Sequence, residues 1–282
     1  MRFLPGPTKA QPADAVLLAA PLMTQNLLAA HPCDRQGFRP AENHFNLRIR
    51  LSPTLAQTNL QLYQQLRTAG HSRQDLVILQ RDNETACMLF GSKIRSTGRP
   101  FLCHAVGTAS AALAQGASLD LVRTAFLHAA YKHGRFPDGT RGNSDAHRSW
   151  LRERTGAEVE KLVFAFSQYP FNVSIARKLV DNGADENQNK EMLLLKLCND
   201  VDDSHDFGAL LAHKPRYSDP HYLSDLETLS RSLGFGVCAE FFAKARRDMA
   251  DNQWLNAETV YSRFPFPRSL VGEIWRRIKG RN

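Results

Sequence analysis

The chain lacks the cysteine patterns that define small metal-bound or disulfide-bonded folds. It has 5 cysteines in 282 residues, no two of them are spaced as Cys-x-x-Cys, and an odd number cannot all pair within one chain. The sequence therefore predicts neither a zinc knuckle nor a disulfide scaffold. Free cysteines within apolar helical segments behave as small hydrophobic residues. We expect this of Cys87, Cys103 and Cys198.

Long apolar runs are also missing, so the sequence predicts no membrane-spanning helix and no membrane partner. The N-terminal stretch MRFLPGPTKAQPADAVLLAAPLM has prolines before a short apolar run and lacks the continuous hydrophobic region of a signal peptide. Together with the free cysteines, this pattern favours a cytoplasmic protein.

Basic residues outnumber acidic ones without an accompanying aromatic-basic motif. The chain has 36 Lys and Arg against 28 Asp and Glu, a formal net charge of +8. Such a charge suits an anionic ligand, and it suits equally a soluble protein with a basic tail. The missing motif argues against nucleic acid as the partner.

No hairpin signal is present, and nearly every segment has a helical period, so we expect an all-α fold. We divide the chain into an N-terminal extension (1–51), a helical domain (52–235) and a C-terminal helical appendage (236–282). Start and stop signals predict helices over 52–70, 72–90, 144–154, 173–181, 186–203, 222–233 and 236–250, one more after Gly156, and two within Arg99–His133. Ala15–Leu28 could hold a short helix, Asn46–Leu51 an extended arm, and the tail after Phe264 a basic helix.

The stretch Arg99–His133 organises the chain. Gly116 stands where a helix C-terminal glycine belongs, and Ser118 is a good N-cap for the next helix. His104 lies early in the first helix and His128 late in the second. Because neighbouring antiparallel helices place the start of one beside the end of the other, we expect the two histidines to meet.

The residues His104 and His128, followed by the polar cluster that starts at Asn199, resemble the HD superfamily of metal-dependent phosphohydrolases, which includes the stringent-response alarmone hydrolases. The likeness covers about residues 85–205 and includes the segments GRP (98–100), FLHAAYKH (126–133) and LLLKLCNDVDD (193–203). It implies an HD-type helical bundle that acts on a phosphorylated or nucleotide-like small molecule. It also implies a divalent metal (Mn, Fe or Zn) held by His104, His128 and Asp200, or by Asn199 in an ungapped alignment.

The sequence also departs from the HD pattern. Ala129 replaces the aspartate that normally follows the second histidine, and Lys132 and His133 replace an acidic pair that helps to activate water. In this respect the chain resembles a sub-family of unknown function in which that aspartate is usually lost. The resemblance leaves Asp200 and His133 as the candidate catalytic residues.

Basic and aromatic residues near the histidines are candidates for binding the substrate. Arginine forks match phosphate geometry, so the loop 91–100 can form a phosphate clamp, or it can be an ordinary solvated loop. The candidate substrate-binding residues are Lys93, Arg95, Arg99, Tyr131 and Lys132, with Arg141 and Arg148 as weaker candidates.

Three functions remain open from the sequence. The first is metal-assisted hydrolysis of a phosphorylated small molecule. The second is a catalytically inactive HD fold that binds a small ligand or a protein partner in the same pocket. The third is an HD-type iron oxygenase. Each of these residues also has a purely structural alternative. His104 and His128 can be buried histidines that bond to each other or to the backbone. Asn199 and Asp200 can form the polar end of a core helix, and Tyr131 can be a core residue.

Overall fold

The computed structural model of the chain describes residues 54–95, 97–183, 189–206, 216, 219 and 221–251. All of them belong to the compact unit Arg50–Asn282. Among them the structure contains helices and no strand, only an isolated antiparallel bridge between Ile94 and Pro100. The all-α prediction is therefore confirmed. The expected extension, with its helix and arm, and the expected basic C-terminal helix lie outside the described residues.

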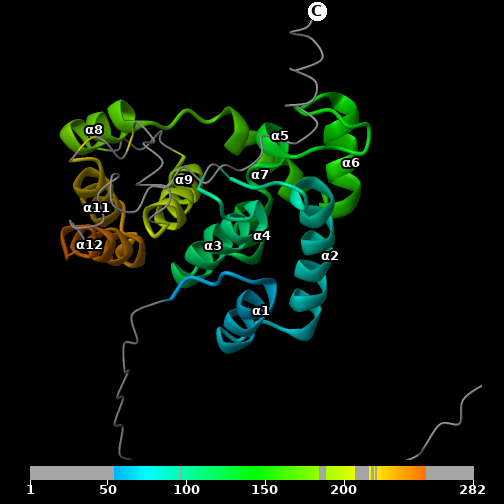
Figure 1. Ribbon diagram of the computed structural model, residues 1–282, viewed down its shortest axis with the longest axis horizontal. Coiled ribbons are helices and arrows are strands. Elements are labelled where there is room, and N and C mark those ends of the chain that lie inside the picture. The colour runs from blue at the N-terminus through cyan, green and yellow to red at the C-terminus, as the bar shows by residue number, and fades with distance from the viewer. Residues whose placement is uncertain are drawn as a thin grey trace, which may run out of the picture. The chain divides into compact units, whose positions relative to one another are not determined.

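Figure 1 shows how the helices are arranged. Their bounds are α1 Asn59–Thr68, α2 Arg73–Phe90, α3 Phe101–Ala114, α4 Leu119–Leu127, α5 Ala130–His133, α6 Asp145–Thr155, α7 Ala157–Gln168, α8 Val173–Asn182, α9 Lys190–Ser204, α11 Tyr222–Ser232 and α12 Gly236–Asp251. None of these described helices is both long and apolar enough to cross a membrane.

Helices α3 and α4 lie at the centre of this unit. Helix α3 packs against α4 and α9, and α4 also packs against α2 and α7 (Figure 1). Helix α11 packs on α12 and α8, and α12 reaches α9. The central place of α3 follows from its sequence, because its ten residues from His104 to Leu113 are all buried and most of them are small. Small side chains let the neighbouring backbones approach closely.

Local capping signals fix most helix ends. The Ser118, Ser144 and Asn172 side chains accept backbone N–H bonds at the starts of α4, α6 and α8. The expected start of the first helix at Ser52-Pro53 is wrong, because residues 54–57 are not helical and α1 begins at Asn59. Thr58 and Gln61 form a reciprocal capping box there, which supplies a stronger start than the serine–proline pair.

The start of α2 gives a simple test of this capping. Ser72 Oγ accepts the Asp75 N–H at 3.2 Å, and Asp75 Oδ2 accepts the Ser72 N–H at 2.9 Å. We expect Ser72→Ala to lower the free energy of unfolding by about 1 kcal/mol, measured by urea denaturation. The matched control is Ser149→Ala on the exposed side of α6, which caps nothing and should leave stability unchanged. Equal effects of the two variants would contradict the assignment.

Candidate functional site

A cavity of about 800 Å³ lies where α3, α5, α9 and the end of α7 meet the segments 93–95 and 169–172. Residues that are far apart in the sequence line it together. Eight of the predicted site residues are among them: Lys93, Arg95, His104, His128, Lys132, His133, Asn199 and Asp200. Ala129 lines the same cavity, so the position at which the HD resemblance would place an aspartate lies there as well.

The two central histidines meet, as the antiparallel arrangement predicted. The ring centroids of His104 and His128 are 5.1 Å apart and the rings are nearly perpendicular. His104 Nδ1 is 2.6 Å from Asp202 Oδ2, and His128 Nδ1 donates to the Ala125 carbonyl at 2.7 Å. Each Nδ1 is therefore occupied, which leaves Nε2 for a ligand. Burial, and then the nearby His104, hold the pKa of His128 well below its usual range, so His128 is neutral.

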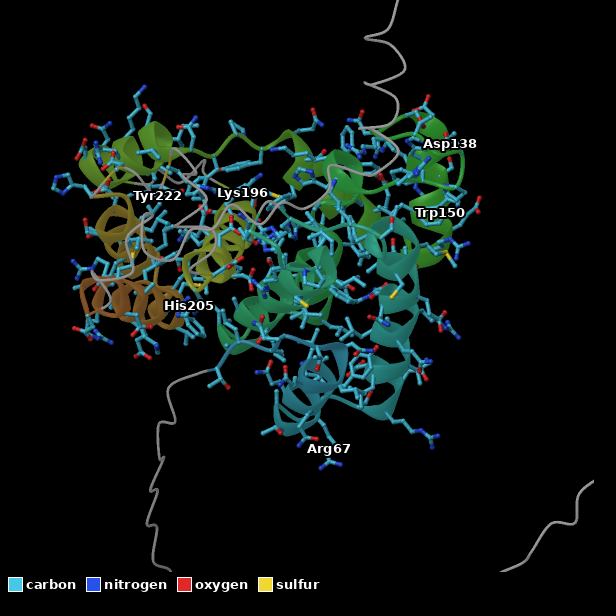
Figure 2. All side chains as sticks on the ribbon, in the orientation of Figure 1. Arg67, Asp138, Trp150, Lys196, His205 and Tyr222 are labelled. Atoms are coloured by element: carbon cyan, nitrogen blue, oxygen red, sulfur yellow. The ribbon has the colours of Figure 1, made fainter. Side chains whose placement is uncertain are left out.

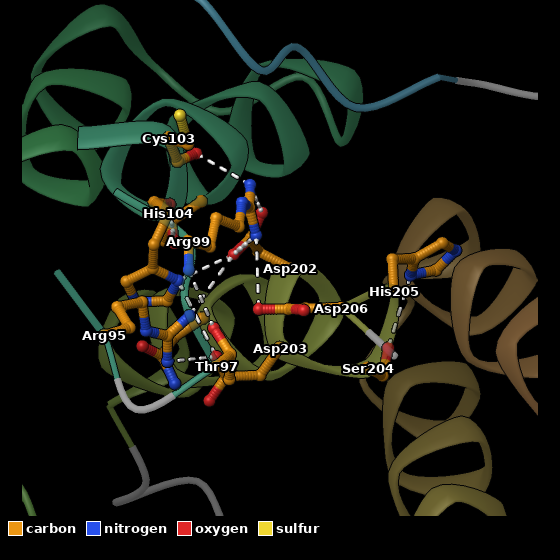
Figure 3. A network of polar contacts seen from close by, with 12 residues as sticks. Arg95, Thr97, Arg99, Cys103, His104, Asp202, Asp203, Ser204, His205 and Asp206 are labelled. Carbon is orange, nitrogen blue, oxygen red and sulfur yellow. Dashed lines mark hydrogen bonds and ion pairs between the residues drawn. The ribbon is translucent and has the colours of Figure 1, made fainter. Parts of the chain in front are cut away.

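Two buried aspartates on α9 face the His104 helix (Figure 3). Asp202 accepts hydrogen bonds from Arg99 Nη1 and Nη2, both at 2.9 Å. Asp203 pairs with Arg95 and, at 3.0 Å, with Arg216 Nη2. The candidate ligand atoms of His104, Asp202 and Asp203 lie within 4.8 Å of one another, so this buried group could hold a metal ion.

This group differs from the metal set suggested by the HD resemblance. Both sets contain His104. The buried group adds Asp202 and Asp203, whereas the resemblance suggested His128, Asn199 and Asp200. The Asp200 carboxylate accepts a 2.7 Å hydrogen bond from the Tyr222 hydroxyl and pairs with Arg216. Burial, and then the Asp200 charge, raise the pKa of Tyr222, so this hydroxyl stays protonated and keeps donating.

Two predicted substrate-binding residues point elsewhere. Arg99 does not line the cavity, because its guanidinium is taken up by Asp202, Gln57 Oε1 (2.6 Å) and the Cys103 carbonyl (2.9 Å). The Tyr131 hydroxyl donates to buried Glu160 at 2.7 Å, in agreement with the core alternative. Arg148, the weaker candidate, pairs with the same glutamate.

The cavity also holds two cations that the sequence reasoning missed, Lys196 and Arg216. Lys196 Nζ donates to the Phe166 carbonyl at 2.9 Å and lies 3.6 Å from the centroid of that ring. Lys93 Nζ donates to the His133 carbonyl at 3.0 Å. Arg95 Nη1 is buried and makes no hydrogen bond with any described group. The lining is therefore strongly cationic.

Burial of His133 predicts an acid-sensitive fold. Burial, and then the neighbouring Lys93, lower the pKa of His133 from 6.5 to about 4. Protonation therefore favours the unfolded chain: the stability is present above pH 6.5 and is lost as the pH falls towards 4. Because solvent screens part of the effect at this half-buried ring, we expect the wild type to lose about 1–2 kcal/mol more than His133→Asn across this window. Urea denaturation at several pH values measures this, and parallel pH profiles of the two proteins would refute it.

Comparison with known proteins adds no family assignment to this geometry. No protein-family model matches the chain, and no curated protein matches it in sequence.

Proposed function

We propose that this chain is an HD-type cytoplasmic protein whose cavity binds a phosphorylated or nucleotide-like small molecule without requiring a metal. The HD-type part of the proposal rests on the sequence resemblance. The observation that carries the binding proposal is the cationic lining of the cavity. Within it, Arg95 Nη1 makes no hydrogen bond with a described group and lies 3.9 Å from Asp202 Oδ2.

The charge balance of the lining supports an anion. Five cationic side chains line the cavity, namely Lys93, Arg95, Lys132, Lys196 and Arg216. The carboxylates in the lining are Asp200 and Asp203, and arginines already neutralise both. The three lysines are left as uncompensated positive charge. Ammonium and guanidinium groups converging on one cavity are the usual partners of phosphate oxygens.

The same ion pairs explain why no metal is needed in this proposal. A metal on Asp202 and Asp203 would compete with Arg99 and Arg95, which already balance the two buried charges. In addition, Ala129 supplies no carboxylate to the cavity. We therefore expect ligand binding to persist in a chelator.

Calorimetric titration with inorganic pyrophosphate in EDTA tests the proposal. Replacing both Lys93 and Lys132, as Lys93→Met with Lys132→Ala, removes two cavity cations and should weaken binding at least tenfold, because charged hydrogen bonds contribute about 1.5–3 kcal/mol each. The matched control is Lys161→Ala, which removes an exposed lysine of α7 outside the lining. Equal affinities for the double variant and the control would overturn the proposal.

A metal-assisted phosphohydrolase is the second candidate, and the two histidines favour it. Metal-binding histidines commonly donate their other N–H to a carboxylate or a backbone carbonyl, as the Nδ1 contacts of His104 and His128 allow. In this alternative Mn, Fe or Zn would polarise phosphate and bound water, and Asp200 and His133 would be the nearby catalytic groups.

Elemental analysis separates the two candidates. Near-stoichiometric metal in the wild type that is lost in His128→Ala would support the phosphohydrolase. Its identity would direct the assay, with iron pointing to the oxygenase chemistry that some HD proteins perform. Absence of metal after supplementation, together with pyrophosphate binding in EDTA, would reject it in favour of the binding protein.

A further inference from the structure

Lys196 differs from the other cations of the cavity in its surroundings. It projects from α9 (Figure 2), and its Nζ is held by the Phe166 carbonyl and lies over the Phe166 ring. It forms no ion pair with a described carboxylate, whereas Arg95 and Arg216 both pair with Asp203. The amine therefore lies against the Phe166 ring in the cavity and forms no ion pair with any carboxylate that the structure describes.

Burial in this environment increases the share of neutral amine, although most of the amine is still protonated at pH 7. Burial, and then the positive charge of Lys132, lower the pKa of Lys196 from 10.5 to about 8. Near neutral pH the fraction of unprotonated amine is then roughly two orders of magnitude larger than for an ordinary lysine. A buried lysine with a lowered pKa is the usual nucleophile for carbonyl carbon.

We propose that Lys196 captures a phosphorylated carbonyl compound as a Schiff base inside the cavity. The inference rests on the proposed function and deepens it by naming the class of ligand. The phosphate would bind beside Arg95, together with Lys93 or Lys132, and the carbonyl carbon would meet the Lys196 amine. The aromatic side chains Phe166, Tyr169 and Phe171, which also line the cavity, would hold the apolar part of the ligand.

The chemistry is balanced without an oxidant, a reductant or a metal. The lone pair of the neutral amine attacks the carbonyl carbon, which forms the N–C bond and places the electron pair on oxygen. The nitrogen loses a proton and the oxygen gains one, giving a carbinolamine. Loss of the second amine hydrogen with the hydroxyl then releases water and leaves the C=N bond.

Pyridoxal phosphate is a suitable probe, because it combines a phosphate, an aromatic ring and an aldehyde. We would incubate the full chain with it near neutral pH, reduce with borohydride and map the labelled peptides by mass spectrometry. Lys196 should be labelled at least tenfold faster than exposed Lys161. Pyridoxal, which lacks the phosphate, should label Lys196 at least tenfold less. The labelling rate should rise with pH, with a midpoint near the pKa of about 8 for Lys196.

The matched variant is Lys196→Arg, which keeps the positive charge but cannot form an imine. It should lose the cavity label. Labelling of Lys93 or Lys161 in preference to Lys196 would overturn the inference, and so would equal labelling by pyridoxal. Because pyrophosphate binding is measured separately, loss of the Schiff base alone leaves the proposed function standing, and loss of pyrophosphate binding in the wild type rejects that function.

Discussion

Replacing Gly107 by alanine should lower the free energy of unfolding by about 3 kcal/mol, although alanine normally stabilises a helix interior. A Cβ at this position of α3 would lie 1.8 Å from Asp202 Oδ1 and 3.3 Å from Arg99 Nη2. Asp202 is only 1 % exposed and is bonded to both Arg99 and His104. It can move away from the new methyl group only by breaking these bonds.

The chain offers a matched control at Gly236. This glycine begins α12, and a Cβ added there meets nothing within 4 Å. We expect Gly236→Ala to leave the free energy of unfolding unchanged or to raise it by up to about 1 kcal/mol. In urea denaturation Gly107→Ala should therefore lose stability, whereas Gly236→Ala should not.

A double variant tests whether the clash with Asp202 is the cause. In an Asp202→Ala background the clashing carboxylate is absent, so adding Gly107→Ala should cost less than about 1 kcal/mol. If the cost of Gly107→Ala is the same in both backgrounds, the clash is not the origin of the destabilisation.

Most of the helical framework could be predicted because its signals are local. Gly116 has a positive φ of 81° between α3 and α4, and Ser118 caps α4, as the sequence indicated. The predicted start of the first helix at Ser52-Pro53 is wrong because a second start signal lies a few residues later, at Thr58. Both signals can be read from the sequence, but their relative strength depends on the hydrogen bonds that form.

The site could be predicted only as far as its residues lie on those helices. The antiparallel arrangement of two neighbouring helices placed His104 and His128 together. It could not show which carboxylate of the run Asp200–Asp203 faces α3, because that depends on how α9 rotates against its neighbours. Gly107, a lone glycine among small helical residues, was the one available sign of close contact there. Arg216 falls where the sequence predicted no element.

Asp202→Asn tests whether this buried network contributes to stability as well as to the site. The substitution keeps the shape of the side chain but removes the charge that balances Arg99 and, at 3.9 Å, Arg95. Removing one partner of a buried ion pair costs about 3–5 kcal/mol, because the remaining charge is left uncompensated.

An exposed ion pair provides the comparison for this substitution. Asp120, whose side chain is 52 % exposed, pairs with Arg123 at 3.1 Å, and Asp120→Asn should cost less than about 1 kcal/mol. Urea denaturation of both variants gives the difference. Similar small losses would mean that water screens Asp202 as well. A large loss confined to Asp202→Asn would mean that its carboxylate balances Arg99 and Arg95 in a low-dielectric environment next to the cavity-lining Arg95.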